Sequence, residues 1–212
     1  KPRAAIIDPI TFGGLLRAID SYEGTPETKA ALQLLCLTTT RPNKELGAME
    51  WSEIDFDNAV WTIPGKKLGK TKKTLFVPLA PQAIAILKSL KNINVEGKYV
   101  FPSVRTPKRH ISENTLNGAL RRLGFSKEEH CAHGFRTSAS TMLNESGLWN
   151  KDAIERQLSH KDKDPVRGVY NRAEYWEERV RMMNYWANHC DVMRLGGNTI
   201  SFRKSSGDTA AK

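Results

Sequence analysis

The sequence has little cysteine and no long apolar run, and both absences exclude classes of protein. Its three cysteines, Cys36, Cys131 and Cys190, stand far apart without a CxxC pair. This pattern predicts neither a disulfide framework nor a zinc ribbon. No stretch approaches the roughly 18 apolar residues of a membrane span, and no apolar core of a signal peptide follows the first residues. We therefore expect a cytoplasmic protein that does not enter a membrane.

Acidic side chains are also in short supply relative to basic ones. The 212 residues include 23 Asp and Glu against 33 Lys and Arg, which gives a formal net charge of +10. Such an excess favours a polyanionic partner, because neutralising phosphates releases condensed counterions. A basic surface is also common on ordinary solvated proteins. Charge alone thus points toward nucleic acid without establishing it.

Helical periodicity dominates the chain, and β-rich runs are few. Helices are predicted at 8–22, 26–39, 81–87, 112–123, 134–146, 150–158 and 174–193, with a short one from residue 43. Two β-rich runs, 59–63 and 74–77, flank a lysine-rich loop. We predict an α+β fold that is mainly α with a small antiparallel β-sheet. Residues 1–195 form its one domain, and the polar residues 196–212 form a flexible tail.

Six side chains suited to phosphate chemistry are spread along these elements. In chain order they are Arg41, Lys70, His133, Arg136, His160 and Tyr170. His133 and Arg136 are three residues apart, so on a helix they face the same way. Taken alone, such an HxxR pair is a frequent accident, a structural histidine beside a solvated arginine. Cys131 and His133 could likewise be offered as zinc ligands, yet the two remaining ligands are missing.

Five segments around these residues, taken together, resemble the motifs of the tyrosine recombinase or phage-integrase family, in the branch of temperate-phage and genomic-island integrases. The segments are Thr40-Arg41-Pro42 with Glu45-Leu46 and Trp51-Ser52-Glu53-Ile54-Asp55, then Val77-Pro78-Leu79, His133-Gly134-Phe135-Arg136-Thr137, Leu158-Ser159-His160-Lys161, and residues 166–175 around Tyr170. One such segment would be weak evidence. Five in the family's order and approximate spacing, across most of residues 8–190, make coincidence improbable.

The resemblance implies a site-specific DNA recombinase that cleaves and religates duplex DNA through a 3′-phosphotyrosyl intermediate, and so integrates or excises a prophage or genomic island. Arg41 and Arg136 would donate paired hydrogen bonds to the non-bridging phosphate oxygens. Two permanent cations serve where other enzymes use metal ions, so we expect a metal-independent enzyme without a cofactor. The sequence also lacks the grouped carboxylates of two-metal nucleases.

Tyr170 is the predicted nucleophile. A tyrosine has an ordinary pKa of about 10, so only about one phenol in a thousand is ionised at neutral pH. His133 would accept its proton, His160 would donate a hydrogen bond to a non-bridging oxygen, and Lys70 would protonate the departing 5′ oxygen. Tyr175 is the competing tyrosine, although packing of an amphipathic helix explains it.

Supporting roles follow for further residues. Glu45 is expected to steady Arg41, but it stands four residues after the arginine, whereas relatives usually place that acid three after. Trp51, Phe76 and Phe135 fit an apolar pattern and are predicted in the core rather than as base-stacking groups. Contacts to DNA are assigned to a set of basic residues that could also be simply solvated: Lys67, Lys72, Arg105, Lys108, Arg109, Arg121 and Arg122.

Partners also follow from the resemblance. We expect duplex DNA attachment sites at the bacterial nucleoid, a homotetramer on DNA, a monomer when isolated, and accessory DNA-bending proteins. Relatives usually carry N-terminal DNA-binding domains, so these residues are expected to be a fragment. The C-terminal helix could be exchanged between protomers or complete its own core. Two other functions stay open: relaxation of DNA as in type IB topoisomerases, which needs no paired sites, and a non-catalytic DNA-binding module, which would not need the full residue set.

Overall fold

The computed structural model describes residues 3–69, 73–93, 97–160 and 175–196. Within these ranges the helices are α1 (Pro9–Asp20), α2 (Pro26–Thr38), α3 (Gly65–Leu68), α4 (Pro81–Ile93), α5 (Glu113–Arg122), α6 (Gly134–Ser146), α7 (Lys151–Gln157) and α9 (Trp176–Arg194). A π-helical turn, η1 (Pro42–Gly47), and a 3-10 turn, η2 (Trp51–Glu53), precede the strands. The strands are β1 (Ile54–Asp55), β2 (Val60–Ile63), β3 (Leu75–Pro78), β4 (Pro102–Ser103) and β5 (Thr106–His110). The predicted fold class, mainly α with a little antiparallel sheet, is confirmed.

Four of the described helices, α1, α2, α5 and α7, begin at a side-chain cap. Asp8 accepts a hydrogen bond from the backbone N–H of Thr11 at 2.8 Å, and Ser112 does the same for Thr115 at 3.2 Å. Asn150 caps α7 in the same way. These caps satisfy N–H groups that the first turn of a helix leaves without a partner. They explain why the predicted helix starts at 8, 112 and 150 agree with the structure within a residue or two.

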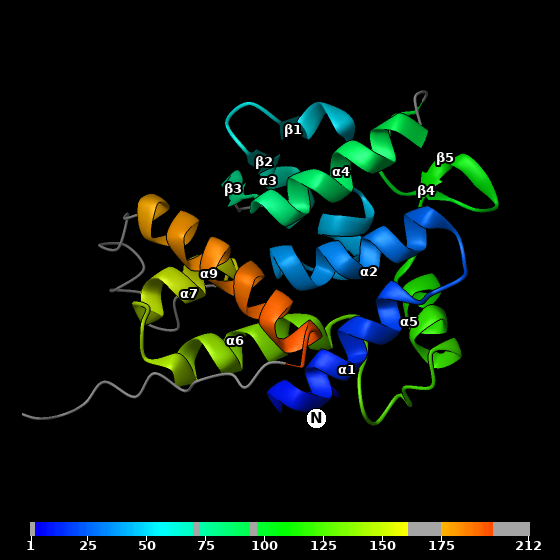
Figure 1. Cartoon of the computed structure of the whole chain (residues 1–212). Helices are drawn as coiled ribbons and strands as arrows, with labels where there is room; N and C mark the ends of the chain where they lie inside the picture. Colours follow the sequence, from blue (N-terminus) through cyan, green and yellow to red (C-terminus); the bar gives the residue numbers. More distant parts are fainter. Residues whose placement is uncertain (1–2, 70–72, 94–96, 161–174, 197–212) are drawn as a thin grey trace, which may run out of the picture.

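Helix α2 lies at the centre of the molecule (Figure 1). It packs against α1, α4, α5, α6 and α9, and nine of its 13 residues are buried. The helix ends at Thr39, which adopts a left-handed conformation with φ 58°. Because neighbours enclose α2, the residues that follow it, including Arg41, leave the core at a fixed place.

The three-stranded sheet has the order β1-β2-β3 with antiparallel pairing, and Trp61 lies opposite Val77. Its buried face contributes Trp61 and Val77 to the core. The prediction that Phe76 lies in the core is wrong: its side chain is 45% exposed. Successive side chains of a strand point to opposite faces, so Phe76, between the buried Leu75 and Val77, must point outward. The second sheet, β4-β5, was not predicted.

Helix α9 completes the core of its own chain. It packs along α1 (Figure 1), and the ring nitrogen of Trp186 donates a 2.8 Å hydrogen bond to the Cys36 carbonyl in α2. Trp186 and Met183 are fully buried. A β-carbon on Gly13 would lie 2.2 Å from the Met193 carbonyl oxygen, so only glycine allows this approach of α1 to α9. None of the described helices combines the length and the apolar composition needed to cross a bilayer.

Candidate phosphate-binding site

Arg41 is positioned by the π-helical turn η1. The N–H of Leu46 donates to the Arg41 carbonyl at 3.0 Å, a bond that spans five residues. This wide turn brings Glu45 back to the arginine. The Glu45 carboxylate accepts a 2.7 Å hydrogen bond from the Arg41 backbone N–H and pairs with its guanidinium. The turn therefore gives a physical reason why the acid can stand four residues after the arginine instead of three.

Arg136 points from the first turn of α6 into the space between α2 and α7. Its Nη1 donates a 3.0 Å hydrogen bond to the Thr39 carbonyl, and its Nη2 donates to the Leu158 carbonyl. The residue is only 4% exposed. Burial, followed by the nearby charge of Arg41, lowers the pKa of Arg136 to about 10, so the group remains a cation at neutral pH.

The two predicted arginine forks converge on one place. Arg41 Nη2 donates to the Ser159 carbonyl at 3.4 Å, next to the Leu158 carbonyl that Arg136 contacts. Both guanidiniums also act on the same two imidazoles, because each lowers the pKa of His133 and of His160. The two like charges repel each other, and the Glu45 carboxylate, paired with Arg41, offsets part of this repulsion. The arrangement suits a group with several negatively charged oxygens.

His133 lies at the N-terminal end of α6, half-buried. Burial, then the positive charges of Arg3, Arg136 and Arg41, lower its pKa to about 4. A neutral imidazole has an unprotonated ring nitrogen, so at pH 7 this side chain can accept a proton. Three cations and burial together thus keep His133 in the form that a proton acceptor needs.

His160 follows α7 and is exposed. Its Nδ1 lies 2.7 Å from Oε2 of Glu155, which orients the ring and leaves Nε2 for another contact. Burial of part of the ring lowers its pKa, and the hydrogen bond to Glu155 works in the opposite direction. An anion near Nε2 would add to the effect of Glu155 and favour the doubly protonated ring, which can donate from both nitrogens.

The predicted nucleophile and loop lysine cannot be placed relative to this site. Tyr170, Lys70 and Lys72 lie outside the described residues. The competing Tyr175 is described: it immediately precedes α9, half-buried, in a left-handed conformation with φ 47°. The roles of Tyr170 and Lys70 therefore stay predictions.

The described residues predicted to contact DNA differ in their exposure to solvent and in their bonds to other residues. Arg105, Lys108 and Arg109 are exposed on the β4-β5 hairpin. The Arg122 guanidinium donates to the Tyr22 hydroxyl at 3.4 Å, and Arg121 donates to the carbonyls of Asn117 and His130.

Lys67 is enclosed as well. Its ammonium forms ion pairs with Glu53 at 2.5 Å and Glu50 at 3.1 Å, and its side chain is 13% exposed. Of these residues, the hairpin cations offer the most accessible charge.

The sequence analysis did not identify two polar residues that lie beside the backbone segments bonded to Arg136. They are Gln157 and Arg179. Both are buried, and they bond to each other between α7 and α9. No sequence signal would have found them, because a glutamine and an arginine on amphipathic helices are normally assigned to the solvated face. Gln157 also donates to the Thr38 carbonyl, next to the Thr39 carbonyl that accepts from Arg136.

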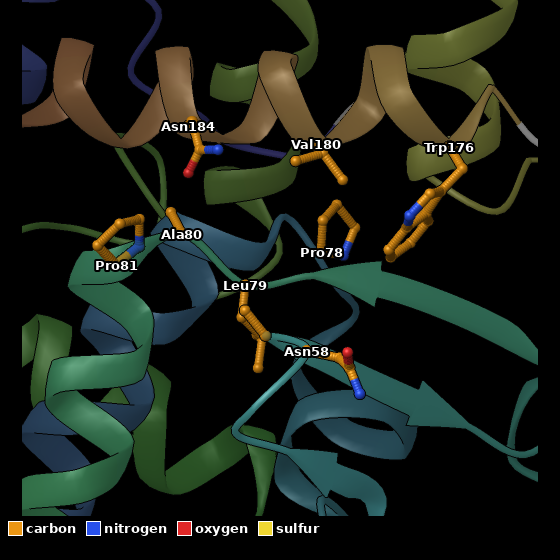
Figure 2. A pocket seen from close by; sticks show the side chains of 9 residues that line it. Asn58, Pro78, Leu79, Ala80, Pro81, Trp176, Val180 and Asn184 are labelled. Atoms are coloured by element: carbon orange, nitrogen blue, oxygen red, sulfur yellow. The ribbon is translucent and has the colours of Figure 1, made fainter.

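One cavity in the described part of the chain lies away from the arginines. Figure 2 shows a cavity of about 370 Å³ where Trp176, Val180 and Asn184 of α9 face Pro78 and Pro81. Its lining is mostly apolar and includes no charged side chain. Within the described ranges, no cluster of three or more His, Cys, Asp or Glu could hold a metal ion. The arginine pair, with its forked N–H donors, has the chemistry that phosphate binding requires.

Comparison with known proteins identifies the family. Residues 13–177 match the sequence profile of the phage integrase family. The chain belongs to this family. It is 43% identical over 193 residues to IntB of Escherichia coli (strain K12), covering 85% of this chain and 48% of that protein. It is 40% identical over 196 residues to the integrase of Enterobacteria phage P4, covering 86% and 44% respectively. The chain thus spans about half the length of these relatives.

Solved structures of the family share the fold. The integrase from mycobacterium phage Brujita aligns with a TM-score of 0.63 and 18% identity, covering 98% of this chain and 63% of that one. A lambda integrase (75–356) dimer bound to a COC′ core site aligns with a TM-score of 0.57 and 20% identity, covering 76% and 59%. The resemblance read from the motifs is confirmed.

Proposed function

We propose that this chain is the catalytic part of a site-specific DNA recombinase, with residues 1–195 as its catalytic domain. It cleaves duplex DNA at an attachment site, holds the 3′ end on Tyr170 and rejoins it to a new 5′ end, and so integrates or excises a prophage or genomic island. The observation that carries the proposal is the convergence of Arg41 and Arg136 on the adjacent Leu158 and Ser159 carbonyls.

The chemistry follows from this charge distribution. Attack on a phosphodiester concentrates negative charge on the non-bridging oxygens, where two guanidinium forks can each donate paired hydrogen bonds. Because both cations are supplied by the chain, the step needs no metal ion. The excess of positive charge that is unfavourable in the free protein becomes favourable when the phosphate is bound.

Proton transfer is assigned to the histidines and Lys70. The low pKa of His133 keeps its ring neutral before DNA binds, so it can accept the tyrosine proton. Once a phosphate offsets the arginine charges, the imidazolium formed by this transfer is less strongly opposed. His160, oriented by Glu155, donates to a non-bridging oxygen. Lys70 protonates the departing 5′ oxygen, and the phosphotyrosyl bond keeps the energy that religation requires.

Partners are proposed on the same basis. The net charge of +10 and the exposed cations of the β4-β5 hairpin favour duplex DNA. The DNA-bound state of the lambda integrase dimer with this fold supports such a partner. We propose a homotetramer on two DNA sites with accessory DNA-bending proteins, acting at the bacterial nucleoid.

The decisive experiment is a search for the covalent intermediate. The chain and, alongside it, the full-length protein are incubated with nicked duplexes that cover the junctions between the encoding element and its host chromosome. We expect a protein–DNA adduct that resists denaturation and disappears in Tyr170→Phe. A full-length protein that binds this DNA without forming an adduct would favour the non-catalytic module. An adduct that persists in Tyr170→Phe would assign the chemistry to Tyr175.

A strand-exchange assay separates recombination from relaxation. Strand exchange between two duplexes bearing junction sequences is expected, with no product from duplexes of unrelated sequence. Relaxation of supercoiled plasmid that lacks any junction sequence, without exchange, would instead support the topoisomerase-like activity.

A further inference from the structure

Arg179 is a fully buried cation in the second turn of α9. Its Nε and Nη2 donate to the side-chain oxygen of Gln157 at 3.1 and 2.9 Å, and Nη2 also donates to the Phe76 carbonyl at 2.5 Å. The residue is 0% exposed. A guanidinium is costly to bury, and these hydrogen bonds hold its planar fork in a single orientation. Arg179 thereby links α9 to α7 and to strand β3.

Gln157 extends this link to α2. Its side-chain Nε2 donates a 3.1 Å hydrogen bond to the Thr38 carbonyl, while its oxygen accepts from Arg179. Gln157 is 1% exposed. One amide group therefore joins the last turn of α7 to the last turn of α2, and Arg179 fixes which way the amide points.

Both ends of this link lie one residue from the carbonyls that hold Arg136. Thr38 precedes Thr39, whose carbonyl accepts from Arg136 Nη1, and Gln157 precedes Leu158, whose carbonyl accepts from Arg136 Nη2. Ser159, which accepts from Arg41, comes next.

The backbone at these carbonyls is strained. Thr39 has φ 58° and Ser159 has φ 49°, a left-handed region that residues other than glycine seldom occupy. Such backbone conformations persist only where the surroundings impose them. The amide of Gln157, bonded beside both segments, is part of those surroundings.

We propose that Gln157 and Arg179 are positioning residues for the phosphate-binding arginines. They set the spacing between the Thr39 and Leu158 carbonyls, and this spacing aims the Arg136 guanidinium at the phosphate. The inference rests on the proposed function for its consequence in catalysis. The positioning itself can be measured without DNA.

Gln157→Glu removes the hydrogen bond between α7 and α2. The glutamate keeps an oxygen for Arg179 and adds a charge that pairs with it, so the fold is expected to survive. It also replaces the N–H donor that faces the Thr38 carbonyl with a second acceptor, which loses that hydrogen bond. Arg179→Met removes the hydrogen bonds from α9 to Gln157 and to the Phe76 carbonyl. Gln82→Met is a matched control, because Gln82 also bonds to α9, at Asn188 and Asp191.

The first readout is the nuclear magnetic resonance of the arginine side chains and backbone amides in the free chain. In Gln157→Glu we expect the Arg136 Nε–H signal to shift and the neighbouring Thr39 and Ser159 amides to exchange faster with solvent. The Gln82→Met spectrum should match wild type at these positions. An unchanged Arg136 signal in folded Gln157→Glu would overturn the proposal, whatever the enzyme does with DNA.

The second readout is the rate of adduct formation at saturating nicked junction duplex. Misplacing a catalytic group commonly lowers the rate about 10- to 100-fold. We expect a loss of rate of this order in Gln157→Glu. The DNA affinity of this variant should stay within about threefold of wild type.

A methylphosphonate at the scissile position sharpens this readout, because it carries one non-bridging oxygen fewer and no negative charge. If Gln157→Glu slows adduct formation through the arginines, much of that loss of rate should disappear on the methylphosphonate substrate. An equal penalty on both substrates would contradict positioning and indicate general damage to the fold. A wild-type protein that forms no adduct counts against the proposed function alone, and the resonance measurement then decides the positioning.

Discussion

Lys67 and Arg136 are both enclosed cations, and they are enclosed in opposite ways. The Lys67 ammonium contacts two carboxylates, those of Glu50 and Glu53, and the carbonyl of Ala48 at 2.6 Å. The Arg136 guanidinium donates to two carbonyls, and the charge that acts on it most strongly is another cation, Arg41. Burial is common to both positions. The sign of the neighbouring charges separates them.

This contrast distinguishes a structural cation from one that is prepared for a ligand. Burial works to raise the pKa of Glu50, and Lys67, together with Lys98, outweighs it and holds that pKa below its ordinary value. The Lys67 cluster is thus complete without a partner. In the arginine pair, Arg136 is buried beside the partly exposed Arg41, and the proposed phosphate would relieve the repulsion between the two cations.

The largest expected effect is at Arg136. Arg136→Met removes one fork from the phosphate, and loss of such a donor commonly lowers the catalytic rate about 10²- to 10³-fold. The melting temperature should change little, because relief of the repulsion from Arg41 offsets the two lost hydrogen bonds. Single-turnover adduct formation and thermal unfolding measure the two effects. A variant that unfolds but keeps its rate when folded would assign Arg136 to structure.

Lys67→Met should show the reverse pattern. Removing the ammonium leaves two carboxylates facing each other in an enclosed place, and we expect the free energy of unfolding to fall by about 3 kcal/mol. Adduct formation by the folded fraction should stay within about threefold of wild type. Chemical denaturation and the adduct assay test this. Normal stability with much weaker DNA binding would instead support the DNA contact predicted from the sequence.

A third prediction concerns pH and the buried His130, which lies near another cation, Arg121. Burial, then the charge of Arg121, lowers the pKa of His130 to about 4. An unfolded histidine has a pKa of about 6.5, so between these values the unfolded chain binds more protons and stability is lost as the pH falls. From pH 7 to pH 4.5 the free energy of unfolding should drop by about 2 kcal/mol through this group. Equilibrium denaturation at several pH values measures the drop.

Two histidine variants test whether this drop belongs to His130. His130→Gln carries no titratable group, so its stability should depend less on pH over the same window. His110→Gln, at the end of β5, should keep the wild-type dependence. The same pH slope in both variants would assign the acid sensitivity to other residues.

The smallest expected effect is at Glu45. Glu45→Gln removes the charge that pairs with Arg41 and leaves a neutral amide in the same space. Because the guanidinium is then held less firmly, the activation free energy of adduct formation should rise by about 1 kcal/mol, which makes the reaction roughly fivefold slower. DNA affinity should rise slightly, since the net charge becomes more positive, and the difference should shrink at high salt. Slower reaction together with weaker binding would mean that Glu45 supports the turn rather than the charge.

Local signals made the fold predictable where one side chain decides the structure. Ser112 and Asn150 cap helices whose starts agree with the structure, and the alternation of β2 and β3 was visible in their β-branched and aromatic residues. Phe76 was misjudged because an apolar residue in a strand was assigned to the core without deciding which face it occupies. The β4-β5 pair was missed because Pro102 and Lys108 are poor strand formers.

The candidate site was predictable from the motifs, and its supports were not. Arg41 and Arg136 are separated by 95 positions in the chain, and their shared approach to residues 158 and 159 depends on how α2, α6 and α7 pack. Lys67 looked like one solvated lysine among several, because its partners Glu50 and Glu53 lie on a different turn. Long-range pairing of this kind leaves no periodic pattern in the sequence.

The close packing of α1 on α9 at Gly13 has a consequence for synthesis of the protein. The ribosome releases α1 before α9, so the groove that receives Trp186 stays open until α9 has been made. Arg179, which bonds to Gln157 beside the arginine pair, also lies on α9. We therefore expect the proposed phosphate-binding site to reach its final arrangement only after α9 has been made.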